Sequence, residues 1–203
     1  MNTEQESKAE LLARLDVMEA MMQAGRRATQ YCGWIFVLWG AAFMIATGWT
    51  LWLGHRNLAW PVTMVAAGVL SAVIGSQRRL KQPKTNTYHA ISAIWIAVGT
   101  ALFLYLFSIS YSGYAEVHSF WAALETLLGA ANFASALILR WRIQILVALT
   151  WWTAAVASCF VSGHLLLPIL MIATLLCQIG YGLYLLYCEH RDRRTSTTAV
   201  QHG

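Results

Sequence analysis

Six long apolar stretches constrain this chain more than any other feature of its sequence. A helix needs about 20 mostly apolar residues to cross a hydrocarbon core roughly 30 Å thick, and each stretch reaches that length. Because lipid offers no hydrogen bonds to the backbone, each stretch is predicted to be a membrane-spanning α-helix. The predicted spans are Tyr31–Leu53, Asn57–Ser76, His89–Ser110, Val117–Leu139, Ile143–Ser162 and His164–Tyr187.

The composition supports this interpretation and excludes several classes of soluble protein. Of the 203 residues, 58% are apolar and only 11% are charged, whereas about 25% are charged in an ordinary soluble domain. A disordered chain and a standard soluble enzyme are therefore excluded. The four cysteines form no C-x-x-C pair, so the sequence indicates neither a disulfide framework nor a zinc framework. We expect an all-α, polytopic membrane helical bundle with six transmembrane helices.

The positive charges fall on one side of this arrangement. Of the 14 Lys and Arg residues, only Arg56 lies in a loop on the other side. Cytoplasmic loops of membrane proteins carry the excess of Lys and Arg, so both termini are predicted to be cytoplasmic in a multi-pass protein of the cell inner membrane. The same rule accounts for the net charge of +5. The expected partner is therefore the lipid bilayer, and no nucleic acid is expected.

Three regions follow from this topology. Residues 1–30 are predicted to form a cytoplasmic amphipathic helix, residues 31–188 the six-helix transmembrane domain, and residues 189–203 a flexible cytoplasmic tail. The loops between the spans are short and leave no room for a separate globular domain. Any activity is therefore expected within the membrane, at its surfaces, or in the N-terminal segment.

The N-terminal segment has the pattern of a short amphipathic helix. Thr3 and Glu6 fit a capping box. Glu10 and Arg14 are spaced as a favourable i,i+4 ion pair. A single apolar stripe, with spacings of four, three and four residues, is made by Leu11, Leu15, Met18 and Met22.

The charge of this segment bears on what it binds. Residues 1–22 hold five acidic and two basic side chains, a net charge of −3. Helices that lie on an anionic inner leaflet usually have a basic polar face, so the leaflet should repel this one. One hypothesis is that the stripe docks onto another helix, in a homodimer or in a membrane or cytoplasmic partner protein. The other is that it packs against the chain's own loops.

A few polar and small residues lie inside the predicted spans. Glu125 is the only acidic residue well within a span, and Gly129 and Asn132 lie on the same face of its helix. Gln178 lies in the middle of the sixth span. A carboxyl group at this depth favours either a proton- or cation-responsive site or a hydrogen bond between packed helices, with Gly129 allowing close approach. The mid-span Trp151 and Trp152 are interpreted as packing residues.

The histidines suggest a metal site on the outer face. His55, His118 and His164 each lie in or beside a different outer loop, and Glu116 is close to His118 in sequence. Three imidazoles and a carboxylate can hold zinc or another transition metal, and opposed histidines can hold haem. However, the three histidines lack any metal-binding spacing, and histidines are common at membrane interfaces. No cofactor is therefore the main expectation, with metal or haem as the alternative.

The N-terminal third resembles a bacterial family of small six-span integral membrane proteins that has no assigned activity. The resemblance is carried by the acidic, Met-bearing segment Glu10–Met22, then by Gly33-Trp34 and Leu38-Trp39-Gly40 in an aromatic first span. It implies a bacterial cytoplasmic membrane, six spans and an acidic amphipathic N-terminal helix. It brings no catalytic residues.

Three functions remain open at this stage. No nucleophile elbow, Walker loop, metalloprotease helix or pair of intramembrane aspartates is present in the sequence. The first hypothesis is therefore a non-enzymatic interaction or accessory module that docks through its N-terminal helix. The alternative is a small transporter or proton-coupled permeation protein that uses Glu125 and Asn132. The second alternative is an outer-face metal- or haem-binding module that uses His55, His118 and His164.

Overall fold

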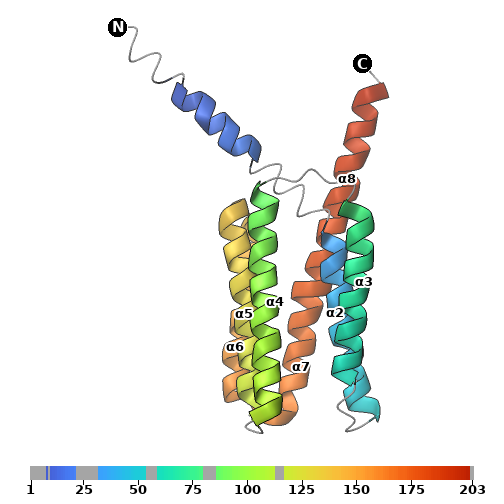
Figure 1. The fold of residues 1–203 in the computed structure, drawn as a ribbon. Helices are drawn as coiled ribbons and strands as arrows, with labels where there is room; N and C mark the ends of the chain where they lie inside the picture. The colour runs from blue at the N-terminus through green and yellow to red at the C-terminus, as the bar shows by residue number, and fades with distance from the viewer. Residues whose placement is uncertain are drawn as a thin grey trace.

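The computed structural model of this chain is an all-helical bundle (Figure 1). It describes residues 8, 10–21, 32–53, 59–79, 86–112 and 117–201. Within these residues, six helical segments are long and apolar enough, by length and composition, to cross a membrane. The all-α prediction is confirmed, and the six segments fit a multi-pass membrane protein.

The observed helices lie close to the predicted spans. The first five spans are single helices, and the sixth is a continuous run of three helical segments. The elements are α2 (Gly33–Leu53), α3 (Ala59–Arg79), α4 (Asn86–Ser112), α5 (Val117–Leu139), α6 (Arg142–Phe160), α7 (Gly163–Thr174), η1 (Leu175–Gly180) and α8 (Tyr181–Gln201).

The sixth span differs from the simple helix that the sequence predicts. Its middle part, η1, is a π-helix, in which the backbone is wound more widely than in the α-helices on either side. Its last part, α8, continues as a helix to Gln201. Most of the segment predicted as a flexible tail, residues 189–201, is therefore helical in this structure.

The sixth span joins two groups of helices. α5 and α6 pack against each other along their length, and α4 packs on α5. On the other side, α2 packs against α3 and against α8. α7 and η1 contact both α2 and the α5–α6 pair, so they lie between the two groups (Figure 1). The rings of Phe36 on α2 and Trp95 on α4 also meet in a T-shaped arrangement, with ring centroids 5.4 Å apart.

The hairpin of α5 and α6 closes through a very short turn at Arg140 and Trp141. Arg140 has φ of 48°, the left-handed region that favours glycine. This conformation ends α5 and lets the Trp141 amide donate to the carbonyl of Ala136 at 3.0 Å. The turn thereby sets α6 antiparallel to α5.

Glycines allow α2 to approach η1 and α8 closely. A Cβ at Gly40 would lie 2.7 Å from Cγ1 of Ile179 and 2.9 Å from Cβ of Gln178. A Cβ at Gly182 would lie 2.9 Å from the carbonyl oxygen of Gly33. Small residues are enriched where membrane helices pack backbone to backbone, and Gly33, Gly40 and Gly182 form such a seam.

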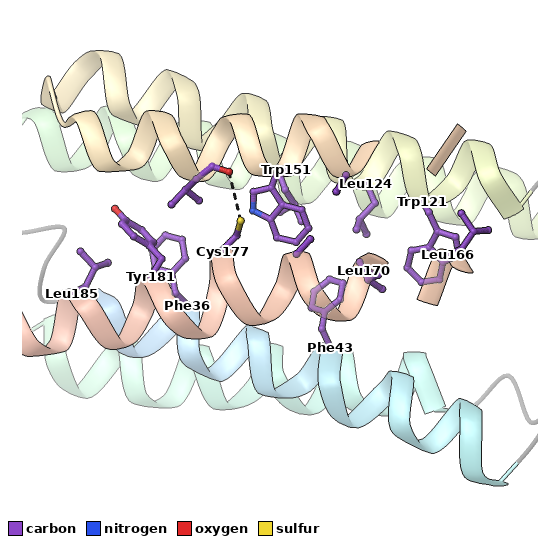
Figure 2. Close-up of a cluster of buried hydrophobic side chains, with 14 residues drawn as sticks. Phe36, Phe43, Trp121, Leu124, Trp151, Leu166, Leu170, Cys177, Tyr181 and Leu185 are labelled. Atoms are coloured by element: carbon purple, nitrogen blue, oxygen red, sulfur yellow. Dashed lines mark hydrogen bonds between the residues drawn. The ribbon is translucent and has the colours of Figure 1, made fainter. Parts of the chain in front are cut away.

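The distribution of polarity is the reverse of that in a soluble protein. The buried interior contains polar residues, namely Thr47, Thr63, Glu125, Asn132, Ser135, Gln144, Ser158, Thr174 and Gln178. The exposed faces of the long helices carry large apolar side chains such as Val65, Ile96 and Phe103. Exposed apolar surface on this scale fits a lipid environment. Between the two groups of helices lies a cluster of aromatic and aliphatic side chains that includes Phe36, Phe43 and Tyr181 (Figure 2).

Residues 10–21 form a helix that lies beyond one end of the bundle, the same end as the C-terminal part of α8 (Figure 1). Arg14 and Glu10 make the predicted i,i+4 ion pair, with 2.7 Å between Nη2 and Oε1. Every side chain from residue 10 to residue 21 is exposed.

Candidate functional site

Among the described residues, one acidic side chain is buried in the bundle, that of Glu125 on α5. Its side chain has no exposed surface, and its Oε2 accepts a hydrogen bond of 2.8 Å from the hydroxyl of Ser158 on α6. Its Oε1 has no hydrogen-bond partner within the described residues. The partner of this intramembrane carboxyl group is therefore a serine, which supplies one hydrogen bond and no counter-charge.

Gly129 lies one turn from Glu125 and packs closely against α6. A Cβ at this position would overlap the indole ring of Trp152 on α6. The indole Nε1 of Trp152 donates to the carbonyl of Thr126 at 3.2 Å. Gly129 therefore contributes space for a tryptophan and contributes no polar group to the site.

Asn132 lies two turns from Glu125 on the same face of α5. Its amide donates to the carbonyl of Leu128 at 2.8 Å, within its own helix. Its Oδ1 has no partner in the described structure, and neither has the hydroxyl of Ser135, one turn further along α5. Both residues have no exposed surface. The structure therefore places an unpaired acceptor and an unpaired hydroxyl in the same interior as Glu125.

Gln178 is also buried, but it lies in a different part of the interior. It belongs to η1, and its Cβ lies against Gly40 of α2. Of the four intramembrane candidates from the sequence, Glu125, Gly129 and Asn132 therefore line the α5–α6 side, whereas Gln178 packs on the α2 side. Its neighbour Cys177 points toward α6, where the thiol donates to the carbonyl of Val147 at 3.6 Å (Figure 2).

Several polar residues of this interior were not predicted as site residues, and Trp151 was interpreted as a packing residue. Trp151 and Gln144 on α6, Thr174 at the end of α7 and Tyr181 at the start of α8 are buried, and each has a polar atom without a partner in the described structure.

We use the name polar column for the buried residues Glu125, Asn132, Ser135, Gln144, Trp151, Ser158, Thr174 and Tyr181. One signal was present in the sequence, because Gln144, Trp151 and Ser158 recur every seven residues on one face of α6, as Glu125 and Asn132 do on α5.

The outer-face histidines are only partly described. His118 is half-buried at the start of α5, where its Nε2 lies 3.1 Å from the carbonyl oxygen of Val161 in the α6–α7 turn. His164 is exposed beside that turn. His55 and Glu116 lie outside the described residues. Within the described residues, no group of three or more His, Cys, Asp or Glu side chains is placed to hold a metal ion.

The stripe on the N-terminal helix is exposed where it is described. Leu11 is 61% exposed, Leu15 49% and Met18 53%, whereas Met22 lies outside the described residues. Leu12, Val17 and Met21 are exposed as well, so the apolar surface of this helix is wider than the predicted stripe. The alternative, in which the stripe packs against the chain's own loops, concerns loops such as residues 80–85 that lie outside the described residues.

The chemistry available to the polar column is hydrogen bonding and proton binding. It contains one carboxyl group, three hydroxyl groups of Ser and Thr, one phenol, two amides and one indole N–H. These groups can bind water or hold a proton at Glu125. No family model, curated protein or solved structure matches this chain.

Proposed function

We propose that this chain is a membrane-embedded, non-enzymatic interaction module that docks a partner protein through the helix of residues 10–21. The observation that supports the proposal is that every side chain of this helix is exposed, including Leu11, Leu15 and Met18. An isolated helix of this length is marginally stable in water, so apolar residues on it gain stability only by packing against another surface. The net charge of −3 over residues 1–22 favours a basic protein surface over an anionic lipid surface.

The proposal includes a location and an orientation. We place both termini in the cytoplasm of a bacterial cell, with the six spans in the inner membrane, because 13 of the 14 Lys and Arg residues would then lie on the cytoplasmic side. The docking helix is then available to cytoplasmic proteins and to the cytoplasmic parts of membrane proteins.

Site-specific photocrosslinking tests the docking surface. A photoreactive amino acid at Leu15, on the stripe, is expected to form a cross-link to a protein in cells. The same group at Ala13, which is exposed on the opposite side of the helix, is the matched control and should give little product. The mass of the product separates a second copy of this chain from a different protein. If the photoreactive group at Leu15 forms no cross-link to any protein, the proposal is wrong.

Deletion gives an independent test of the same function. Removing residues 2–24 should abolish the association and leave the bundle inserted and folded, because the described helix 10–21 lies outside the bundle. The triple variant Leu11→Ser, Leu15→Ser, Met18→Ser should have the same effect, and the control pair Ala13→Ser, Ala20→Ser should not. An association that survives the deletion rules the docking role out.

A second candidate function is supported by a separate observation, the polar column. A buried carboxyl oxygen and a buried amide oxygen without partners, at Glu125 and Asn132, are what a proton-coupled permeation protein needs in its interior. Proton flux into vesicles that contain the purified protein tests this candidate. Glu125→Gln should lower the flux, whereas Thr126→Val, at an exposed neighbouring position, should leave it unchanged. Equal fluxes for the wild type and Glu125→Gln remove this candidate.

A further inference from the structure

The polar column has a definite register between α5 and α6. The hydrogen bond from Ser158 to Glu125 aligns the two helices at one level, and the short turn at Arg140 makes them antiparallel. Seven residues are two turns, or about 10 Å at 1.5 Å per residue. A step of seven residues from Glu125 leads to Asn132, and the equal step from Ser158 leads to Trp151. Asn132 and Trp151 therefore lie at the same level of the bundle.

A third residue joins this level from α7. Cys177 of η1 is level with Val147 on α6, because its thiol donates to the Val147 carbonyl. α7 and η1 run antiparallel to α6, so Thr174, three residues before Cys177, lies one turn nearer to Trp151. Figure 2 shows Trp151 and Cys177 facing each other across the space between these helices.

The polar atoms at this level are complementary but not bonded to one another. The indole Nε1 of Trp151 is only a donor, Oδ1 of Asn132 is only an acceptor, and the hydroxyl of Thr174 is both. All three residues are at most 1% exposed, and these three atoms have no hydrogen-bond partner in the described structure. Buried polar groups in proteins are almost always hydrogen-bonded, to protein or to ordered water.

We infer that Asn132, Trp151 and Thr174 form an internal binding site for water between α5, α6 and α7. One water molecule accepts a hydrogen bond from Nε1 of Trp151 and donates one to Oδ1 of Asn132, and the Thr174 hydroxyl supplies a third partner. Three hydrogen bonds are the usual number for a buried water molecule. The site lies directly before η1, and π-helical turns often mark positions where a helix is adapted to a ligand.

Further buried polar atoms without partners lie on both sides of this site along the bundle. Unpaired atoms at Glu125 lie toward one end of the column, and those at Ser135, Gln144 and Tyr181 lie toward the α5–α6 turn. The Tyr181 ring is 6.3 Å from the ring of Trp141 in that turn, which places it at this end. Water at the Asn132 level, about 10 Å from the Glu125 level, would therefore supply one intermediate step between the Glu125 carboxyl and the end of the bundle at which the N-terminal helix lies. This step deepens the second candidate function, whereas the water site itself does not depend on that function.

Nuclear magnetic resonance of the full chain, labelled with ¹⁵N-tryptophan in detergent micelles, tests the water site. The Trp151 indole N–H should show a cross-peak to water, and Trp151→Phe identifies its signal. If that variant does not fold, assignment through the Trp151 backbone identifies the same signal. Trp152 is the internal control, because its indole already donates to the Thr126 carbonyl and should show no water cross-peak.

Two variants test whether the proposed residues hold the water. Asn132→Leu and Thr174→Val should each reduce or remove the Trp151 cross-peak. The matched control is Thr47→Val, because Thr47 is equally buried but its hydroxyl already donates to the Phe43 carbonyl at 2.8 Å. A folded wild type without the Trp151 cross-peak overturns the inference. A cross-peak that both variants leave unchanged overturns it as well.

The proton flux experiment separates this inference from the second candidate function. If the water cross-peak is present and Asn132→Leu lowers proton flux to the level of Glu125→Gln, the water site supports the link to Glu125. If the cross-peak is present and the wild type shows no flux, the permeation function is wrong and the water site stands. If flux is present without the cross-peak, the inference is wrong and the permeation function stands on Glu125 alone.

Discussion

The hydroxyl of Ser158 on α6 donates to Oε2 of Glu125 on α5 across 2.8 Å, and neither side chain has any exposed surface. This bond connects two helices whose facing surfaces also carry Asn132, Gln144 and Trp151. It fixes their register, and through the seven-residue spacing of the polar residues it brings Asn132 to the level of Trp151. The hydrogen bond from the Trp152 indole to the Thr126 carbonyl is a second link between α5 and α6 beside the polar column.

The energy of this bond can be measured with a double-mutant cycle. Ser158→Ala and Glu125→Leu each remove one partner, and the double variant removes both. We expect a coupling free energy of about 1 kcal/mol, because interhelical hydrogen bonds in membrane proteins average about 0.6 and reach about 1.7 kcal/mol. Unfolding in mixed micelles with increasing denaturing detergent gives the four free energies of unfolding. If the two substitutions change the free energy of unfolding additively, the hydrogen bond between Ser158 and Glu125 does not contribute to stability.

The packing of Gly129 against Trp152 predicts a large effect from one methyl group. Gly129→Ala places a Cβ into the indole ring, and overpacking of this kind costs about 1–3 kcal/mol of unfolding free energy. Gly68→Ala on α3 is the control, because a Cβ there meets no atom within 4 Å. The control should be neutral or slightly stabilising, since alanine favours a helix over glycine. Equal losses of stability in both variants would show that the indole is not the cause.

The seam between α2 and α8 predicts a second glycine effect. In Gly182→Ala the new methyl group meets the backbone oxygen of Gly33 at 2.9 Å, and backbone cannot move aside as a flexible side chain can. We expect a loss of thermal stability greater than that of Gly99→Ala on α4, where a Cβ meets nothing within 4 Å. Thermal unfolding of the purified variants in detergent measures both. If the melting temperature of Gly182→Ala equals that of the control, Gly182 is not closely packed against the backbone of Gly33.

The helices were predictable from the sequence because the hydrocarbon thickness fixes both their length and their composition. α5 begins and ends at Val117 and Leu139, the residues that hydropathy alone predicts. The π-helix η1 was not predictable in the same way, because it changes which backbone groups are bonded and leaves the apolar pattern intact. Gly180 and Gly182 close to Gln178 are the only local hints of its position.

The candidate site was predictable only on one helix. Glu125 and Asn132 were found because a carboxyl group and an amide are costly in lipid and so identify themselves in an apolar span. Ser158 was missed because a serine in a membrane helix can bond its own backbone and therefore gives little signal. Trp151 was interpreted as a packing residue, because its unpaired N–H depends on which side of α6 faces α5, and that is a tertiary property.

The orientation of the bundle is the last prediction, and cysteine labelling tests it. In a variant whose four native cysteines are replaced by alanine, we expect Ser162→Cys, exposed in the α6–α7 turn, to react with a membrane-impermeant maleimide on intact cells. Glu19→Cys, exposed on the N-terminal helix, should react only after the cells are permeabilised. The reason for this expectation is the excess of Lys and Arg on the side of the N-terminus, because such an excess favours the cytoplasmic side. The opposite labelling pattern would place the docking helix outside the cell, and the proposed cytoplasmic partner would then be wrong together with the topology.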